Sequence, residues 1–220
     1  PLLIEASIIP PEKMVAIMRD KLYHMLSGTM RDAIIEASDV LTRTGDPQLS
    51  DVLLDRAYFH EMGATAQKSE SEFLMGYVAL LTDLANLRII TRAKRAEKAL
   101  DYLKRAVMKG GTIAFDRLIC EPTPDFILET FGATALIIPA QMAAGALNKE
   151  HTMADLDRAC DNALMGYIKS ARLVAFGEAH VIAYIIAFEA QLVAVRTVMM
   201  GRKVGLSEDK IEERLRESYV

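Results

Sequence analysis

The tetrapeptide Leu54-Asp55-Arg56-Ala57 recurs as Leu156-Asp157-Arg158-Ala159 about 100 residues later, and this recurrence decides how the chain is divided. A second match precedes it. Ile9-Pro10-Pro11-Glu12-Lys13-Met14 corresponds to Ile113-Ala114-Phe115-Asp116-Arg117-Leu118, with apolar, acidic and basic types falling in the same order. Because a four-residue identity can arise by chance, the order and separation of further matches carry the argument.

A third match follows the first two. Leu84 and Arg88 correspond to Leu192 and Arg196 at nearly the same separation. Insertions in the loops between matching helices would produce the small differences in separation. Three ordered matches therefore predict an internal duplication. The expected organisation is the tail of a preceding module at 1–9, a helical module at 10–110 and a second helical module at 111–220.

The composition predicts an all-α protein. The chain has 220 residues, of which 51% are hydrophobic and 25% charged, so it is typical of a globular protein that can bury a sizeable core. Aromatic residues make up only 6%, Trp is absent, and the counts of Gly (12) and Pro (7) are low. Strand-rich folds need more turn residues and more aromatic side chains than this chain supplies.

Helical spacing and helix-start signals point to the same class. Two segments carry apolar stripes that we expect to face a core: Phe73, Tyr77, Leu81 and Leu84 in the first, and Val181, Ile185 and Leu192 in the second. Ser69-x-x-Glu72 predicts a capping box. Thr123 before Pro124, Thr152 and Ser207 predict further N-caps.

Several function classes find little support. The net charge of -4 removes the global electrostatic argument for nucleic-acid binding, and no Gly-x-x-x-x-Gly-Lys-Ser/Thr loop is present to hold a nucleotide. The four histidines fall in separate segments without metal-ligand spacing, and Cys120 and Cys160 are expected to be free thiols. The uncharged run 130–148 is interpreted as a buried helix pair, not as a membrane span. We therefore expect no cofactor, no metal, no nucleic acid and no membrane-spanning segment.

Three stretches resemble a known family. The segment Asp51-Val52-Leu53-Leu54-Asp55-Arg56-Ala57-Tyr58-Phe59 is similar to its paired-aspartate and Tyr-Phe segment, and Asp83-Leu84-Ala85-Asn86-Leu87-Arg88 to its Asp-x-x-Asn-Leu-Arg helix. Residues 184–220 are similar to its C-terminus. On these residues the chain resembles the C subunit of archaeal and bacterial A/V-type rotary ATPases, the relative of the eukaryotic d subunit. It departs from the family pattern near Gln191, where a second acid is expected, and at Ala194, where an Asn is expected.

The resemblance implies both an architecture and a task. Members of the family have three helical modules around a pseudo-threefold axis, so this chain would contain two of the three. The resemblance further implies a non-catalytic, funnel-shaped socket on the cytoplasmic face of the membrane rotor ring. This socket receives the tip of the central-shaft coiled coil and couples ATP hydrolysis or synthesis to the transport of protons or sodium ions.

Arginines and acidic residues are the candidate site residues. Arg88 and Arg196 each follow an apolar stripe, and a buried unpaired charge costs several kcal/mol. Each therefore either pairs inside its own module or lines the socket. The basic run after Arg88 is either a solvated helix face or a contact with the ring or anionic headgroups. The expected shaft or ring contacts are Arg88, Arg92, Lys94, Arg95, Arg196, Arg202 and Lys203. The expected structural motif comprises Asp51, Asp55, Tyr58, Asp83, Asn86 and Glu189.

Two other functions remain open at this point. A free-standing helical-repeat scaffold would bind a partner helix in a groove and would need neither a shaft nor a ring. A helical enzyme with a diffuse site would show a concave pocket with perturbed titratable groups.

Overall fold

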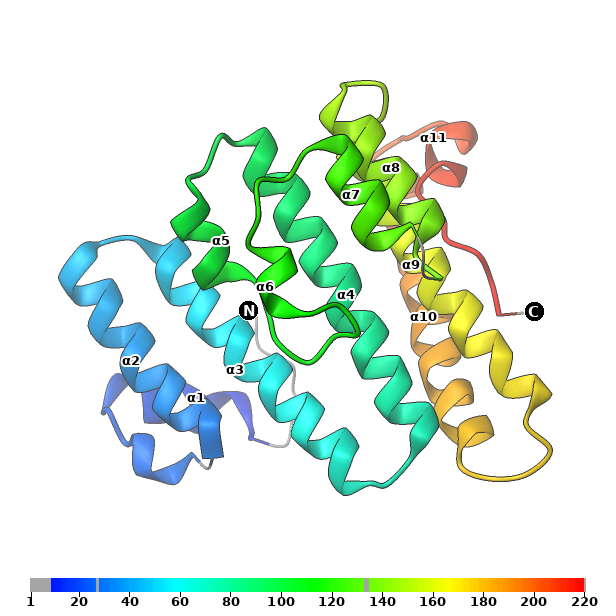
Figure 1. Ribbon diagram of the computed structural model, residues 1–220. Coiled ribbons are helices and arrows are strands. Elements are labelled where there is room, and N and C mark those ends of the chain that lie inside the picture. Colours follow the sequence, from blue (N-terminus) through cyan, green and yellow to red (C-terminus); the bar gives the residue numbers. More distant parts are fainter. Residues whose placement is uncertain (1–8, 27, 133–134, 220) are drawn as a thin grey trace. The chain divides into compact units, whose positions relative to one another are not determined.

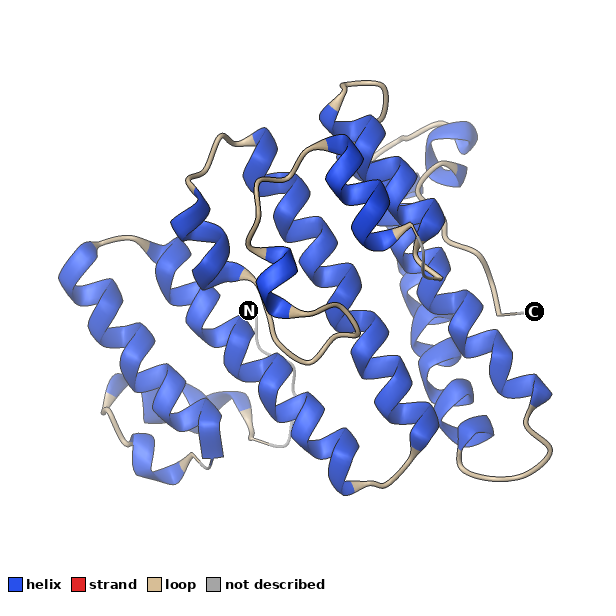
Figure 2. Ribbon diagram, in the orientation of Figure 1, coloured by secondary structure: helices blue, strands red, loops and turns tan. Residues whose placement is uncertain are grey.

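The computed structural model describes residues 9–26, 28–132 and 135–219. Every regular element in these ranges is a helix and none is a strand, as Figure 2 shows, which confirms the predicted all-α class. The predicted tail at 1–9 lies outside the described residues except for Ile9. The repeated modules at 10–110 and 111–220, and the funnel, stay predictions.

The chain forms two units. The first, Pro1–Glu61, contains α1 (Pro11–Arg19), η1 (Tyr23–Met25), α2 (Gly28–Thr44) and the first part of α3 (Pro47–Lys68). The second, Met62–Val220, contains the rest of α3 and then α4 (Glu72–Arg95), α5 (Leu100–Ala106), α6 (Phe115–Leu118), α7 (Pro124–Phe131), α8 (Ile137–Leu147), α9 (Met153–Lys169), η2 (Ser170–Leu173), α10 (Ala179–Lys203) and α11 (Glu208–Glu212).

Small side chains and two polar contacts organise the first unit. Ala33 and Ala37 are the buried residues of α2. The Ser50 hydroxyl of α3 donates to the carbonyl of Ala37 over 2.8 Å. The backbone N–H of Met30, in the first turn of α2, donates to the Glu61 carboxylate over 3.0 Å. This bond satisfies one of the N–H groups that a helix N-terminus leaves without an intrahelical partner.

The core of the second unit forms around α4. Leu84, Leu87 and Ile90 of α4 are fully buried. The helix packs against α8 and α9, and α7 in turn packs on α8 (Figure 1). The described part of the uncharged run 130–148 supplies the end of α7 and all of α8, where alanines allow neighbouring helices to approach closely. The alanines of α8 are buried as predicted, whereas Ile137 and Ile138 in its first turn are 48% and 61% exposed.

Of the four predicted caps, those at Thr123 and Thr152 are confirmed, and Ser207 stands at the N-cap of α11 without a capping bond from its side chain. The Thr123 hydroxyl accepts from the N–H of Phe126 over 3.1 Å. Thr152 and Asp155 form a full capping box, and the backbone N–H of Thr152, then its hydroxyl, lower the pKa of Asp155. The box predicted from Ser69 to Glu72 is wrong, because Ser71 caps α4.

The ends of α3 and α4 explain that error. Ser69 lies just beyond the end of α3, and its hydroxyl donates to the carbonyl of Ala66 over 2.6 Å. Ser71 then accepts from the N–H of Leu74 over 3.2 Å and donates to the Glu178 carboxylate over 2.7 Å. Ser69 thus bonds to the last turn of α3, and Ser71 caps the start of α4.

The predicted core face of α10 is wrong. Val181, Ile185 and Leu192 are 61%, 52% and 53% exposed. The buried face carries Ala179 and Ala183, with Ala187 one turn further on. Small side chains let α10 pack closely on its neighbours, so the bulky residues lie on the opposite side.

Two described helices, α4 and α10, are long and apolar enough to cross a membrane when judged by length and composition alone. The apolar stretch of α4 is partly buried against α8 and α9, as expected of a core helix. Most of α10 is exposed. The apolar residues of α10 therefore form exposed surface, unlike those of α4.

The two thiols provide a test of this core. Cys160 is buried among the residues packed on α4, and burial raises the pKa of its thiol to about 12, whereas Cys120 is exposed. Since the thiolate is the reactive form, iodoacetamide at about pH 8 should alkylate Cys120 at least about 100-fold faster than Cys160. Peptide mass spectrometry after timed labelling measures both rates, and labelling in denaturant is the control. Equal rates in the folded protein would contradict this packing.

Candidate functional site

A charge cluster joins α4 to α9. The Arg88 side chain is 19% exposed. Its Nε donates to Asp157 Oδ1 over 3.0 Å, and its Nη2 donates to Asp161 Oδ1 over 2.5 Å and to the Asp157 carbonyl over 3.1 Å. The guanidinium fork thus contacts two carboxylates that lie one turn apart on one face of α9.

Two further arginines complete the cluster. Arg92, one turn after Arg88, donates to both carboxylate oxygens of Asp157 over 3.0 and 2.9 Å. Arg216 Nε donates to Asp161 Oδ2, the other oxygen of that carboxylate, over 2.7 Å. Three cations therefore share two anions, and the cluster connects α4, α9 and the segment after α11.

The segment after α11, residues 213–219, is held along α9 by several contacts. Arg158 Nη1 donates to the carbonyl of Glu213 over 3.2 Å. The backbone N–H of Glu217 donates to Asn162 Oδ1 over 3.0 Å, and the Lys169 ammonium lies 3.4 Å from the Glu217 carboxylate. We call residues 213–219 the C-terminal strap. At its end the Arg172 guanidinium lies over the Tyr219 ring.

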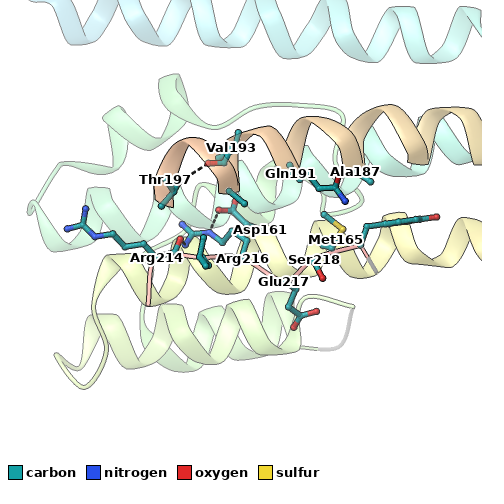
Figure 3. Close-up of a pocket in the computed structure, with 14 residues that line it drawn as sticks. Asp161, Met165, Ala187, Gln191, Val193, Thr197, Arg214, Arg216, Glu217 and Ser218 are labelled. Carbon is teal, nitrogen blue, oxygen red and sulfur yellow. Dashed lines mark hydrogen bonds and ion pairs between the residues drawn. The ribbon is translucent and has the colours of Figure 1, made fainter. Parts of the chain in front are cut away.

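A hollow of about 280 Å³ lies between α9, α10 and the C-terminal strap (Figure 3). The strap runs between the two helices and forms one wall. Met165, Ala187, Ala190 and Val193 supply apolar surface to the other walls. The hollow is thus lined mainly by carbon, with polar groups from the strap at its edge.

Arg196 differs from Arg88, although the two correspond in the sequence. It lies exposed on α10 and makes no ion pair with any residue that the structure describes. Arg88 pairs with carboxylates, as one of the two interpretations expected, but those carboxylates lie on α9 and not within 10–110. The matching positions of the two segments therefore have different surroundings.

Asp83 and Asn86 fasten the loop between α5 and α6 onto α4. Both side chains are buried. Asn86 exchanges two hydrogen bonds with the backbone of Met108, of 2.9 Å and 2.8 Å. Asp83 accepts from the N–H and hydroxyl of Thr112 over 2.8 and 2.6 Å. A Cβ at Gly111 would overlap the Asp83 carboxylate, so the loop needs glycine at this point.

The remaining candidates of the acidic motif lie on α3 and α10. Asp51, Asp55 and Tyr58 are exposed on α3. Desolvation raises the pKa of Asp55, and the negative charge of Asp51 one turn earlier raises it further. The Tyr58 ring meets the Phe59 ring edge-on at 5.8 Å between centroids. Glu189 is exposed on α10.

The other basic candidates lie at helix ends. Lys94 pairs with Glu121, and Arg95 is exposed at the end of α4. Arg202 and Lys203 are exposed in the last turn of α10. Cations in a last helical turn complement the negative end of the helix dipole. These residues thus form exposed charged surface at the ends of α4 and α10.

The sequence interpretation missed Asp157, Asp161 and Arg216. Asp157 lies inside the repeated tetrapeptide, and Asp161 follows it at the i,i+4 spacing that places two carboxylates on one helical face. This i,i+4 spacing was the sequence signal from which a paired-carboxylate face could have been predicted. The arrangement holds helices together and leaves cations exposed elsewhere, and among the described residues no group of His, Cys, Asp and Glu is placed to hold a metal ion.

Comparisons with known proteins agree on one family. Residues 2–214 match the model of the ATP synthase (C/AC39) subunit family. The chain is 26% identical over 201 residues to the C subunit of the A-type ATP synthase of Halobacterium salinarum (strain ATCC 29341 / DSM 671 / R1), an alignment that covers 86% of this chain and 56% of that protein. It is 20% identical over 199 residues to the C subunit of the V-type sodium ATPase of Enterococcus hirae, covering 88% and 59%. The chain thus spans little more than half the length of these relatives, and no solved structure matches it.

The loop fastening predicts a loss of stability for Asn86→Ala. This variant leaves the buried N–H and carbonyl of Met108 without their partner, at a cost of about 1 to 3 kcal/mol in the free energy of unfolding. Urea denaturation followed by circular dichroism measures the change. Gln141→Ala, at an exposed position of α8, is the matched control and should stay within about 0.5 kcal/mol. Equal stability of the two variants would contradict the fastening.

The two arginines should respond differently to the same truncation. Arg88→Ala leaves Asp161 and Asp157 with less compensation in a partly buried interface and should reduce the free energy of unfolding by about 1 to 3 kcal/mol. Arg196→Ala should change it by less than about 0.5 kcal/mol. Urea denaturation followed by circular dichroism measures both changes. Similar losses of unfolding free energy in the two variants would contradict the environments assigned to Arg88 and Arg196.

Proposed function

The chain belongs to the ATP synthase (C/AC39) subunit family, and from this premise we propose that it is a non-catalytic subunit of the central stalk of an A- or V-type rotary ATPase. The match over residues 2–214 is the observation that carries the proposal. In this role the chain couples a central-shaft coiled coil to the membrane rotor ring. ATP hydrolysis or synthesis at the catalytic head is thereby linked to the transport of protons or sodium ions.

The work of such a subunit is mechanical, and the second unit has features that suit it. A coupling element must resist shear, and the buried α4 is fastened by packing, by the Arg88 cluster and by the Asn86 and Asp83 contacts. Several independent contacts of this kind oppose local opening. Torque transmission through this unit requires no catalytic group.

The proposed contacts use the exposed cations. Arg92, Lys94 and Arg95 lie in the last turn of α4, whereas Arg196, Arg202 and Lys203 lie along the C-terminal part of α10. Some of these charges face the shaft and others the ring on the cytoplasmic face of the membrane. Arg88 supports the surface from within, because its charge is already matched by Asp157 and Asp161.

A free-standing scaffold for a partner helix is the second candidate function. The exposed apolar face of α10 favours it, since such a face is typical of a surface that binds another helix. The two functions differ in their partners. A rotor subunit needs a long coiled-coil shaft and a ring, whereas a scaffold needs neither.

Co-purification tests the proposed function. The full chain is expressed with the tagged central-shaft subunit of the same organism, and in a parallel experiment with the detergent-solubilised ring. Stable capture in both experiments is the expected result, and a protein interface of this kind should bury more than about 1,000 Å². Absence of capture by a chain that is folded by circular dichroism would overturn the rotor assignment and favour the scaffold.

A further inference from the structure

The C-terminal strap follows one polar face of α9. Its bonding partners are spaced one or two turns apart, so they form a row along one side of the helix. These partners are Arg158, Asp161, Asn162 and Lys169 of α9, followed by Arg172 of η2. Within the strap, Leu215 and Tyr219 are half-buried and the other residues are exposed. The strap is therefore attached mainly through polar contacts at the surface.

A hollow lies on each side of the strap. The first, of about 280 Å³, is the hollow between α9, α10 and the strap. The second, of about 300 Å³, lies between α8 and α9, with Ile138 and Met142 in its wall. Glu217 of the strap lines both hollows. A segment beside unfilled space makes fewer dispersion contacts than a closely packed one, so the strap depends on its bonds.

The ion pairs that hold the strap are exposed to solvent. Arg216 pairs with Asp161, and Glu217 pairs with Lys169. All four side chains are more than one third exposed. Exposed ion pairs contribute little to stability, and dissolved salt screens them. The attachment of the strap should therefore weaken as the ionic strength rises.

Two of the partners on α9 have a second bond of their own. Asp161 accepts from Arg216 through Oδ2 and from Arg88 through Oδ1. Arg158 donates to the strap backbone and, over 3.2 Å, to Asp155. Release of the strap leaves both side chains paired, so the large cost of a shielded charge without compensation does not arise. The joint between α4 and α9 keeps its bonds to Arg88.

The strap has a fixed end at α11. Ile211 of α11 is buried. A Cβ at Gly201 would lie 2.7 Å from Ile211 Cγ1, so the Ile211 side chain packs directly against the backbone of α10. This contact holds α11 in place, and the chain after it is free to pivot at residues 213–214.

We propose that the C-terminal strap is a salt-sensitive latch, which leaves α9 by pivoting at the end of α11 and thereby uncovers the apolar hollow between α9 and α10. Helices α4, α8 and α9 stay folded during this movement. The closed latch shields Met165 and Ala187 from water, and the open latch gives access to them. The inference goes beyond the proposed function and does not rest on it, because it concerns a movement within the second unit.

A thiol placed beneath the strap measures the opening. Met165 is buried and lies on the α9 face that the strap follows, where it lines the hollow. Met165→Cys is made in a full-length chain that carries Cys120→Ser, and Cys160 in the core serves as the internal reference. Ala187→Cys reports on the same hollow from α10 if the first variant does not fold. Alkylation by iodoacetamide at about pH 8, followed by peptide mass spectrometry, gives the labelling rates.

Salt should open the latch. Between about 20 mM and about 500 mM NaCl, labelling of the introduced thiol should become at least about 3-fold faster relative to Cys160, since salt screens the ion pairs. The same thiol in the urea-denatured chain corrects for any effect of salt on its intrinsic reactivity. Equal corrected rates at the two salt concentrations would overturn the latch. Equal acceleration of Cys160 would also overturn it, because the core between α4 and α9 would then open together with the strap.

Removal of the two ion pairs should have the effect of salt. Arg216→Gln with Lys169→Gln should speed labelling at least about 5-fold at low salt, with an unchanged midpoint of urea unfolding, because Asp161 keeps its bond to Arg88.

Arg95→Gln with Arg117→Gln is the matched control for this pair of substitutions. It removes the same charge from exposed positions of α4 and α6 and should change the labelling rate less than about 2-fold. Equal effects of the two pairs, or faster labelling accompanied by a lower urea midpoint and faster labelling of Cys160, would overturn the proposal.

Discussion

The position of α9 against α4 depends on the neutralisation of one guanidinium. Arg88 lies between the two helices, mostly shielded from water, and must find compensating charge there. Asp157 and Asp161 supply it, and Asp161 then accepts from Arg216 as well. Because the same carboxylate contacts both arginines, the placement of α9 and that of the C-terminal strap are linked. Together with the contacts of Arg158, Asn162 and Lys169, these bonds hold the wall of the hollow beneath the strap.

The positions of small residues determine which faces of α8 and α10 are buried and which side chains remain exposed. Alanines along α8 allow it to approach α4 closely, and fully buried large side chains such as Leu84, Leu87 and Phe131 fill the core around them. The same choice on α10 buries Ala183 and Ala187 and turns Tyr184 and Phe188 outward. One helix therefore leaves most of its large apolar side chains exposed and buries mainly its small ones.

Composition and local spacing were sufficient for the helical class and for the caps at Thr123 and Thr152, since both depend on near neighbours in the sequence. Apolar periodicity failed on α10 because it weights bulky residues, whereas the buried side carries alanine. The partners of Arg88 lie 69 and 73 residues away, and no local pattern encodes such a pairing. Long-range charge pairing and the choice between two faces of a helix are properties of packing.

Arg88 and Arg196 show how matching positions can take different tasks. Each follows a leucine by four residues, and each lies on a long helix. A facing helix with two aspartates satisfies Arg88, and its charge is used to hold the unit together. No described carboxylate meets Arg196, so its charge remains available at the surface. Two matching sequence positions thus differ in effect, because one guanidinium joins helices in the interior and the other leaves a charge at the surface among exposed apolar side chains.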